Sequence, residues 1–417
     1  MFETKDPTKR VIVSGLDTNN PSFNYEMTEL ANLAMANNFE VVKKITQKLD
    51  HPINGTYFGS GKINEIKEWL DAEECDYLVV NDELSPIQIK NLEKMTRRQV
   101  IDRTKLILLI FADRAQTKQA KLQVRLAELQ YELPRLREQN VSYDQQRGGS
   151  ALTRGSGETA LELNRRTIDK QIAFIKNELV KISKQEATKA QARKKSALPH
   201  VALIGYTNAG KSTTLNQILR QYSANPKLVF EKNMLFATLD TSIRRVDLPD
   251  KRSIILSDTV GFVSKLPHKL VEAFKATLQE VLDADLLVNV VDVSDSHQKE
   301  MIETTKQVLK EIGADKIPMI TAYNKIDRTD NYPGIIGDDV YYSARNSIDN
   351  LIKLISRKAF HYLEPVTLEL ATDQGNILNQ LYSEGQVLKT EYESDKIEVS
   401  VYLPQNSKEK FKQYIKE

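Results

Sequence analysis

The chain has 417 residues, of which 28% are charged, and its formal net charge is only +2. This length allows two or three domains with ample cores, so folding requires neither a disulfide nor a structural metal. Cys75 is the single cysteine, which excludes an internal disulfide and a cysteine zinc cluster and fits a reducing cytosol. The polar N-terminus begins no signal peptide, and the longest apolar runs, 106–111 and 286–291, are too short to span a bilayer. We therefore expect a cytoplasmic monomer without a membrane span.

The first 114 residues are predicted to form an α/β domain in which strands and helices alternate. A helix is indicated at 27–36 by its apolar spacing. Strands are indicated at 11–13, 41–42, 77–80 and 106–111. This alternation predicts a small doubly wound sheet.

Inside this domain, residues 59–62 partly match a phosphate-binding loop. The match is incomplete because Thr56 occupies the position of the first glycine and Ile63 replaces the metal-binding hydroxyl. A glycine turn that opens a helix is therefore favoured over a second nucleotide site.

Residues 115–197 are predicted to form an arm of two antiparallel helices. Apolar residues step by threes and fours, as on one face of a helix, at 122, 126, 129, 133 and 136 and again at 168, 172, 175, 179 and 182. The tip is predicted at 140–157, a glycine-rich loop that carries Tyr143, Arg147 and Arg154. Arginine and aromatic planes suit phosphates and unstacked bases of RNA, although a flexible linker would have a similar composition.

Basic residues are concentrated at 97–166, including Arg103 and Arg135, and again at 184–195. Such density is typical of a surface that binds a phosphate backbone, and equally of solvated helix faces. Charge alone does not separate these two interpretations.

The segment 205–212 is the most specific motif in the chain. It fits G-x-x-x-x-G-K-[ST] without a mismatch, and the apolar run 201–204 leads into it as a buried strand would. In this motif backbone N–H groups surround the phosphates, Lys211 reaches the β/γ oxygens, and the Ser212 hydroxyl takes one Mg²⁺ position. A P-loop domain is therefore predicted at 198–364.

Residues 324–327, Asn-Lys-Ile-Asp, indicate that the base is guanine. The Asp327 carboxylate can accept hydrogen bonds from the N1–H and the exocyclic amine of guanine, whereas adenine offers neither donor and would leave a charge unpaired. Sites of this kind can discriminate by roughly 10⁴. Ser343, Ala344 and Arg345 follow a predicted strand and are expected to bring backbone N–H groups to the guanine O6.

A metal-side aspartate lies between these two motifs. Asp258 ends a predicted strand and is expected to hold Mg²⁺ through water, while the Gly261 N–H meets the γ-phosphate. Thr238 is placed where a switch threonine would close on Mg²⁺, with Thr241 and Thr207 as alternatives. The residues predicted to hold the metal are Ser212, Thr238 and Asp258, and those predicted to be catalytic are Lys211, Thr238 and Gly261. The residues predicted to bind GTP are Gly205, Tyr206, Thr207, Asn208, Ala209, Gly210, Lys211, Ser212, Thr213, Phe236, Ala237, Thr238, Leu239, Asp240, Asp258, Thr259, Val260, Gly261, Asn324, Lys325, Ile326, Asp327, Ser343, Ala344 and Arg345.

Phe262 stands where many GTPases place a glutamine that orients the attacking water. Phenylalanine neither donates nor accepts a hydrogen bond, so slow intrinsic hydrolysis is expected. No arginine of this chain is identifiable as an arginine finger, the residue that stabilises negative charge in the transition state. That stabilisation is therefore expected from a partner or a bound cation. Asn208 resembles the asparagine that coordinates K⁺ in cation-dependent relatives of this class, or it braces the loop.

Residues 365–417 are predicted to form a small α+β domain. Strands are indicated at 366–370 and 397–402, and a helix near 375–382. Two roles fit this segment equally well. It could provide a surface that docks a partner, or it could support the P-loop domain structurally.

Several strings in the chain resemble the HflX-type ribosome-associated GTPases of the translation-factor-related class. They are GSGK (59–62), DELSPIQ (82–88), VIDRT (100–104), IFADRA (110–115), LPRL (133–136), RGSGET (154–159) and LFATLD (235–240). The resemblance covers about residues 10–364 and implies the same order of domains, binding to the large ribosomal subunit, and separation of stalled or idle ribosomes. It also implies that the arm's tip points toward the peptidyl transferase region, that the ribosome stimulates hydrolysis, and that an apolar residue at Phe262 is usual.

The chain departs from this family's pattern at four positions. Ser156 replaces the usual proline, Asn164 replaces an aspartate, Thr241 replaces a proline, and Ser347 stands where a glycine often follows. The first two lie at or beside the tip of the arm, whereas none affects GTP binding. They suggest a divergent paralogue that rescues ribosomes blocked by drugs at the catalytic centre and is thus linked to antibiotic resistance.

Three functions are compatible with these features. The first is a GTP-driven factor that splits ribosomes into subunits. The second is a GTP-sensing assembly or regulatory factor that binds a precursor subunit or another RNA without separating subunits. The third is an ATP-using RNA remodeller acting through the N-terminal domain, which the incomplete loop at 59–62 makes the weakest of the three.

Overall fold

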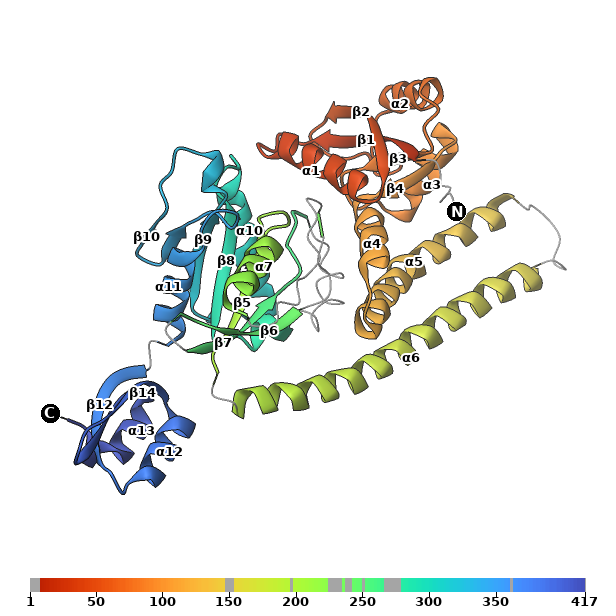
Figure 1. The fold of residues 1–417 in the computed structure, drawn as a ribbon. Coiled ribbons are helices and arrows are strands. Elements are labelled where there is room, and N and C mark those ends of the chain that lie inside the picture. Colours follow the sequence, from red (N-terminus) through yellow and green to blue (C-terminus); the bar gives the residue numbers. More distant parts are fainter. Residues whose placement is uncertain are drawn as a thin grey trace, which may run out of the picture.

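The computed structural model describes residues 8–146, 154–195, 198–223, 235–236, 242–249, 252–265, 279–360 and 363–416. An N-terminal α/β domain, a two-helix arm, a P-loop domain and a small C-terminal domain follow one another along the chain (Figure 1). The predicted fold class is therefore confirmed. The proposed boundaries at 114, 197 and 364 stay predictions.

The N-terminal domain is built on a four-stranded parallel sheet of order β2-β1-β3-β4. Its strands are β1 (Lys9–Asp17), β2 (Phe39–Lys48), β3 (Tyr77–Val80) and β4 (Gln99–Asp102). Its helices are α1 (Phe23–Ala36), α2 (Ser60–Ala72), α3 (Pro86–Thr96) and α4 (Arg103–Arg114). The strand order reverses between β1 and β3, so their carboxyl ends form the edge where ligands and partner groups meet in sheets of this type.

The run 106–111, predicted as a strand, lies instead in helix α4. The Asp102 side chain caps this helix by accepting a hydrogen bond from the Lys105 N–H at 2.8 Å. Five of the six residues in the run are buried. An apolar run of this length fits a buried strand and a buried helix alike, and here the capping aspartate decides for the helix.

Residues 59–62 open helix α2, as the favoured interpretation predicted. Gly59 is the residue that caps the helix, in extended backbone conformation, and Ser60 begins it. The Lys62 ammonium, which a phosphate loop would aim at a nucleotide, instead pairs with Glu65 on the same helix at 2.6 Å.

The arm consists of α5 (Lys118–Gln146) and α6 (Arg154–Lys195), which run antiparallel (Figure 1). Leu126, Leu129 and Ile175 are buried along their seam, and Lys118 pairs with Glu178 across it at 3.1 Å. Both helices enter the segment predicted as the tip, 140–157, because α5 continues to Gln146 and α6 begins at Arg154. Residues 147–153 of that segment lie outside the described residues.

The middle of helix α5 is fixed to the N-terminal domain by Asp102, which is fully buried at the end of β4. Its carboxylate accepts hydrogen bonds from the Tyr131 hydroxyl at 2.9 Å and from Arg135 at 3.0 Å. Burial raises the pKa of Asp102, while these contacts act in the opposite direction. Arg135, and likewise the buried Arg103, therefore belong to internal contacts and not to a basic surface.

The P-loop domain has a seven-stranded sheet of order β10-β11-β9-β8-β5-β7-β6, which is parallel except for the β6–β7 and β10–β11 pairs. Its strands are β5 (His200–Gly205), β6 (Ser242–Asp247), β7 (Ser253–Asp258), β8 (Leu286–Asp292), β9 (Met319–Asn324), β10 (Gly334–Ile336) and β11 (Asp339–Tyr341). Its helical segments include α7 (Lys211–Tyr222), α9 (Gln279–Leu282), α10 (Gln298–Ile312), η1 (Ile326–Arg328) and α11 (Asp349–Ala359). The carboxyl ends of β5, β7, β8 and β9 share one edge, where all the predicted motifs lie.

The C-terminal domain is an antiparallel sheet of order β12-β14-β13 around a small apolar core. Its elements are β12 (Leu363–Ala371), α12 (Gly375–Glu384), β13 (Gln386–Tyr392), β14 (Lys396–Pro404), α13 (Gln405–Lys410) and η2 (Lys412–Tyr414). Strand β13 and helix α13 were not predicted. The domain lies beside the P-loop domain, at the opposite end of the molecule from the N-terminal sheet (Figure 1).

Candidate active site

The phosphate loop connects β5 to α7 through two glycines in the left-handed region of backbone space. Gly205 has φ 130° and Gly210 has φ 99°. A Cβ atom at Gly205 would lie 2.3 Å from the Val290 carbonyl oxygen, and one at Gly210 would lie 2.2 Å from the Asn324 side chain. Both positions thus require glycine on conformational and steric grounds.

Lys211 begins helix α7 and is almost completely buried. Its ammonium donates to the carbonyl oxygens of Gly205 at 3.0 Å and Tyr206 at 2.8 Å. Burial lowers the pKa of Lys211 to about 8, while the Asp258 carboxylate acts in the opposite direction. A buried cation next to the N–H groups of a helix N-terminus is an arrangement that favours a bound anion.

Two of the residues predicted to hold the metal, Ser212 and Asp258, lie side by side at the edge of the sheet. The Ser212 hydroxyl donates to a carboxylate oxygen of Asp258, at the end of β7, at 2.8 Å. Hydroxyl and carboxylate oxygens are the donors that Mg²⁺ prefers, so these residues fit the metal that GTPases use. When bound, Mg²⁺ neutralises charge on the β- and γ-phosphate oxygens. Ala237, Thr238, Leu239, Asp240 and the alternative Thr241 lie outside the described residues, so their roles stay predictions.

The Asn-Lys-Ile-Asp segment is attached to the phosphate loop by its own side chains. Asn324 donates to the Ala209 carbonyl at 3.0 Å and accepts from the Ala344 N–H at 2.9 Å. Lys325 donates to the Asn208 carbonyl at 2.7 Å. The segment that would read the base is therefore held in a fixed position relative to the loop that would hold the phosphates.

Asp327 stands at the mouth of this site, with one carboxylate oxygen accepting a hydrogen bond from the Ser343 hydroxyl at 2.6 Å. Ser343 and Ala344 are buried, while the Arg345 side chain is exposed. The structure thus brings together the residues predicted for guanine from two separate segments. Their roles in binding stay predictions.

Two curated relatives, both named GTPase HflX, cover almost the whole chain. The protein from Caldanaerobacter subterraneus subsp. tengcongensis is 39% identical over 413 residues, which are 99% of this chain and 94% of the relative. The protein from Escherichia coli (strain K12) is 36% identical over 414 residues, which are 97% of this chain and 96% of the relative. The chain belongs to the HflX family of GTPases. It is therefore an enzyme that hydrolyses GTP to GDP and phosphate.

Three family profiles match this HflX-family chain in succession. Their descriptions are GTP-binding GTPase N-terminal for 24–112, GTP-binding GTPase middle region for 114–193, and 50S ribosome-binding GTPase for 200–325. A solved structure described as the complex of SsGBP with GDP is 25% identical, with a TM-score of 0.49, and covers 85% of this chain and 99% of its own. No helix in the described part of the chain is long and apolar enough to cross a membrane.

Phe262 of this HflX-family chain is buried in the same apolar core as Tyr206 and Phe236, and its ring does not replace a water-orienting side chain. Phe236, which precedes the predicted switch threonine, packs edge-to-face on Phe111 of α4, with ring centroids 4.7 Å apart. One apolar core thus continues from the N-terminal domain to the segments around the active site.

Asp292 is a site residue that the motifs did not reveal. Its carboxylate accepts from the Lys325 ammonium at 2.6 Å, and both side chains are largely buried. It ends β8, at the carboxyl edge of the parallel sheet where ligands bind, and that position is the signal that could have identified it.

The residues predicted to contact RNA lie at the ends of the arm helices. Tyr143 is in the last turns of α5, and Arg154 begins α6. Arg147 lies outside the described residues. Their contacts with RNA stay predictions.

Proposed function

We propose that this GTPase binds the large ribosomal subunit in its GTP-bound form and splits stalled, idle or drug-blocked ribosomes, and that hydrolysis releases it. The observation that carries this proposal is the arm, which extends from the N-terminal domain well beyond the P-loop domain (Figure 1). Helix α6 has 42 residues, so it is about 60 Å long at 1.5 Å per residue. That length suits a probe that reaches into a large folded RNA.

The anchoring of the arm supports the same proposal. Tyr131 and Arg135, near the middle of helix α5, attach the arm to Asp102, so the arm and the N-terminal sheet are expected to move as one body. A factor that separates two subunits must bind one of them in a pose that the other cannot accept. A long arm that is fixed to the N-terminal domain midway along α5 can hold such a pose, whereas a freely hinged arm would move aside.

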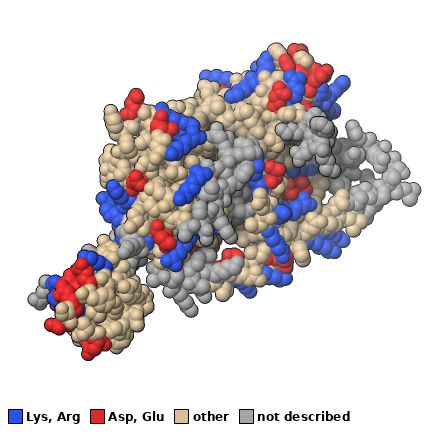
Figure 2. Space-filling view, viewed as in Figure 1, with Lys and Arg blue, Asp and Glu red and all other residues tan. Residues whose placement is uncertain are grey.

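The charge of the arm adds a smaller contribution. Figure 2 shows Lys and Arg beside Asp and Glu along its described part, and Arg165, Arg166 and Lys181 form ion pairs within α6. Helix α6 nevertheless contains 11 Lys and Arg residues against 5 Asp and Glu, so the arm keeps a net positive charge that favours binding to phosphates.

Sucrose gradients of intact ribosomes incubated with the purified protein and GTP, GDP or a non-hydrolysable GTP analogue test this proposal. We expect loss of the intact-ribosome peak with GTP and with the analogue but not with GDP. Migration with the large subunit without separation would contradict splitting and favour the assembly or regulatory function. An absence of any association would contradict the ribosome as partner.

We also propose that a monovalent cation assists hydrolysis through Asn208, whose side chain is exposed at the mouth of the phosphate loop. Because Phe262 supplies no hydrogen bond to water, a K⁺ ion beside the phosphates would contribute the missing positive charge. Hydrolysis is expected to be faster in KCl than in NaCl, and Asn208→Ala is expected to remove that difference. Equal rates in both salts for the unaltered protein would contradict the proposal.

The substitutions around the arm's tip support a more specific use. Ser156 and Asn164 change residues at or beside the part of the arm that would lie nearest the catalytic centre of the ribosome. We infer that the protein rescues ribosomes blocked there by antibiotics. Deletion of its gene should then increase sensitivity to one or more large-subunit antibiotics, and unchanged growth under all of them would contradict the inference.

A further inference from the structure

A cavity of about 570 Å³ lies where the C-terminal domain meets the P-loop domain. Residues of α11, of the end of α7 and of the segment before β7 line it from the P-loop domain, and a residue of β14 lines it from the C-terminal domain. A cavity of this size can hold a small molecule. The lining of this junction cavity includes Tyr222, Arg252, Asp349, Lys353, Arg357 and Tyr402.

The junction cavity is remote from the GTP site. Lys211 begins α7 at the phosphate loop and Tyr222 ends it, so a helix of 12 residues, roughly 17 Å long, lies between the two sites. Likewise Arg252 precedes β7, whereas the metal-side Asp258 ends this strand. The cavity therefore lies at the opposite edge of the sheet from the nucleotide.

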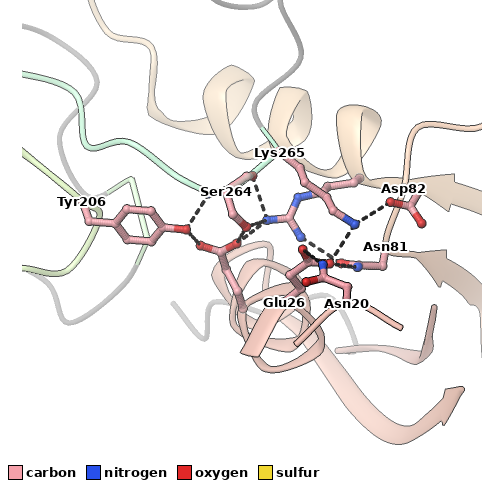
Figure 3. A network of polar contacts seen from close by, with 9 residues as sticks. Asn20, Glu26, Asn81, Asp82, Tyr206, Ser264 and Lys265 are labelled. Carbon is pink, nitrogen blue, oxygen red and sulfur yellow. Dashed lines mark hydrogen bonds and ion pairs between the residues drawn. The ribbon is translucent and has the colours of Figure 1, made fainter. Parts of the chain in front are cut away.

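The cavity is also separate from the contact between the N-terminal and P-loop domains (Figure 3). In that contact Arg103 donates to the Ser264 carbonyl at 3.0 Å. Glu29 accepts hydrogen bonds from Arg103 and from the Tyr206 hydroxyl. None of these four residues lines the junction cavity, so a substitution in the cavity leaves their side chains unaltered.

Arg252 joins the C-terminal domain to the P-loop domain beside the cavity. Its side chain is largely buried and donates to the Ser356 hydroxyl. Its guanidinium lies between two rings, with the Phe360 centroid at 4.4 Å and the Tyr402 centroid at 4.6 Å. Stacking of a cation on aromatic faces is favourable, so this contact holds Tyr402 and its domain at the edge of the cavity.

Cationic side chains of α11 line the cavity with most of their hydrogen-bonding capacity available. Lys353 and Arg357 are both exposed, and their spacing of four residues places them on one face of the helix. Within the described residues, Arg357 donates to the Gly337 carbonyl at 3.0 Å, and the Lys353 ammonium has no hydrogen-bond partner. Both side chains can therefore donate to an incoming anion.

Asp349, the acidic residue of the lining, does not cancel this positive charge. Its carboxylate already accepts hydrogen bonds from Gln221 and from the Tyr222 hydroxyl, each at 3.3 Å, and from the Ser347 hydroxyl at 3.1 Å. Three cations, including Arg252, thus face one carboxylate whose oxygens have partners. The cavity therefore favours a negatively charged ligand.

The cavity also offers apolar surface, which an inorganic anion alone would leave unused. Tyr222 and Tyr402 bring rings from the two domains, and Pro249 and Ile352 add aliphatic surface. Nucleobases stack on aromatic rings of this kind, and cations beside such rings bind the attached phosphates. A ligand that combines a planar base with a phosphate uses both features of the lining.

We propose that the junction cavity binds a nucleoside phosphate, with Lys353 and Arg357 holding the phosphate and a tyrosine ring stacking on the base. A free nucleotide and an unpaired nucleotide of an RNA present the same chemistry and are the two sources of such a ligand. Because the lining belongs to two domains, the ligand also holds the C-terminal domain against the P-loop domain. The inference goes beyond the proposed function and does not depend on the ribosome as partner.

Titration of the GDP-saturated protein with AMP that carries a fluorescent label on its ribose tests the inference. GDP fills the GTP site, and Asp327 is expected to reject adenine there, so binding of AMP reports a different site. We expect saturable binding that unlabelled AMP competes, and competition by inorganic phosphate that is at least about tenfold weaker because phosphate has no base. An absence of saturable binding, or equal competition by phosphate and AMP, would overturn the inference.

Substitutions on both sides of the cavity locate the bound AMP. Lys353→Ala combined with Arg357→Ala removes two exposed cations and should weaken binding at least about tenfold. Tyr402→Ala should weaken it as well, whereas Tyr402→Phe keeps the ring and should retain most of the affinity. Lys62→Ala, in the incomplete loop at 59–62, is the control and should change nothing. A loss of binding in Lys62→Ala but not in the α11 double variant would overturn the inference.

Short single-stranded RNA oligonucleotides distinguish the two sources of the ligand. If a free nucleotide is the ligand, an oligonucleotide should compete no better than AMP. If RNA is the ligand, it should compete better at low salt, and the α11 double variant should remove that gain. Displacement of AMP by an acidic peptide but by no oligonucleotide or unlabelled nucleotide would overturn the inference. Because no ribosome is present, the result is independent of the splitting assay.

Discussion

Asp327→Asn is expected to change the base preference from guanine to xanthine. The carboxylate of Asp327 can accept from both the N1–H and the exocyclic amine of guanine, whereas asparagine offers one acceptor and one donor. Xanthine carries a carbonyl in place of that amine, so it matches asparagine and not aspartate. The affinity for GDP should fall by up to roughly 10⁴, while that for the xanthine diphosphate rises.

The structure indicates that this change is tolerated locally. Asp327 is at the surface and its one described side-chain partner is the Ser343 hydroxyl, at 2.6 Å, which can donate equally well to the oxygen of asparagine. Titration of both diphosphates against the variant measures the preference. Asp330→Asn, three residues further along in an exposed position, is the control. A variant that binds GDP as tightly as before would show that Asp327 does not read the base.

Lys211→Ala is expected to lower the rate of GTP hydrolysis by at least about 10²-fold. The Lys211 ammonium is the one charge of the phosphate loop that can follow the β- and γ-phosphate oxygens as negative charge develops, and removal of such a group usually costs 10²–10³ in rate, or about 3–4 kcal/mol. Single-turnover release of phosphate measures the effect. A residual rate within about tenfold of the unaltered protein would contradict this role.

The same variant should remain folded, which separates loss of chemistry from loss of structure. Lys211 is buried as a cation whose described hydrogen bonds go to two carbonyl oxygens, and burial lowers its pKa to about 8. Removing it relieves the cost of burying a charge, so the thermal stability without nucleotide should not fall below that of the control Lys299→Ala, an exposed lysine in α10. Stability in saturating GDP should rise less for Lys211→Ala than for the control.

The phosphate loop and the seam of the arm were predictable because each depends on local spacing. The loop is defined by residues 205–212 alone, and helical periodicity identifies Leu126, Leu129 and Ile175 directly. The helix at 106–111 was not predictable, because a run of six apolar residues is compatible with a buried strand and with a buried helix. Only the Asp102 cap at the start of α4 distinguishes them.

The contact between the domains was beyond the reach of the sequence for a physical reason. Arg103 meets Glu29 and Ser264, which are 74 and 161 residues away along the chain. In the sequence Arg103 is one of many basic residues, and no feature of the sequence distinguishes it from a residue on a charged surface. Its pairing depends on how two sheets are placed relative to each other, and no local pattern encodes that placement.

The most direct test of the proposed function is the number of ribosomes that each protein molecule splits. Intact ribosomes are mixed with a smaller amount of the protein, and subunit separation is followed by light scattering. With GTP, each molecule should split many ribosomes in succession. With the non-hydrolysable analogue it should split one and remain bound to the large subunit, and with GDP none. Scattering that stays constant with both GTP and the analogue would contradict the proposal that the GTP-bound form of this protein splits ribosomes.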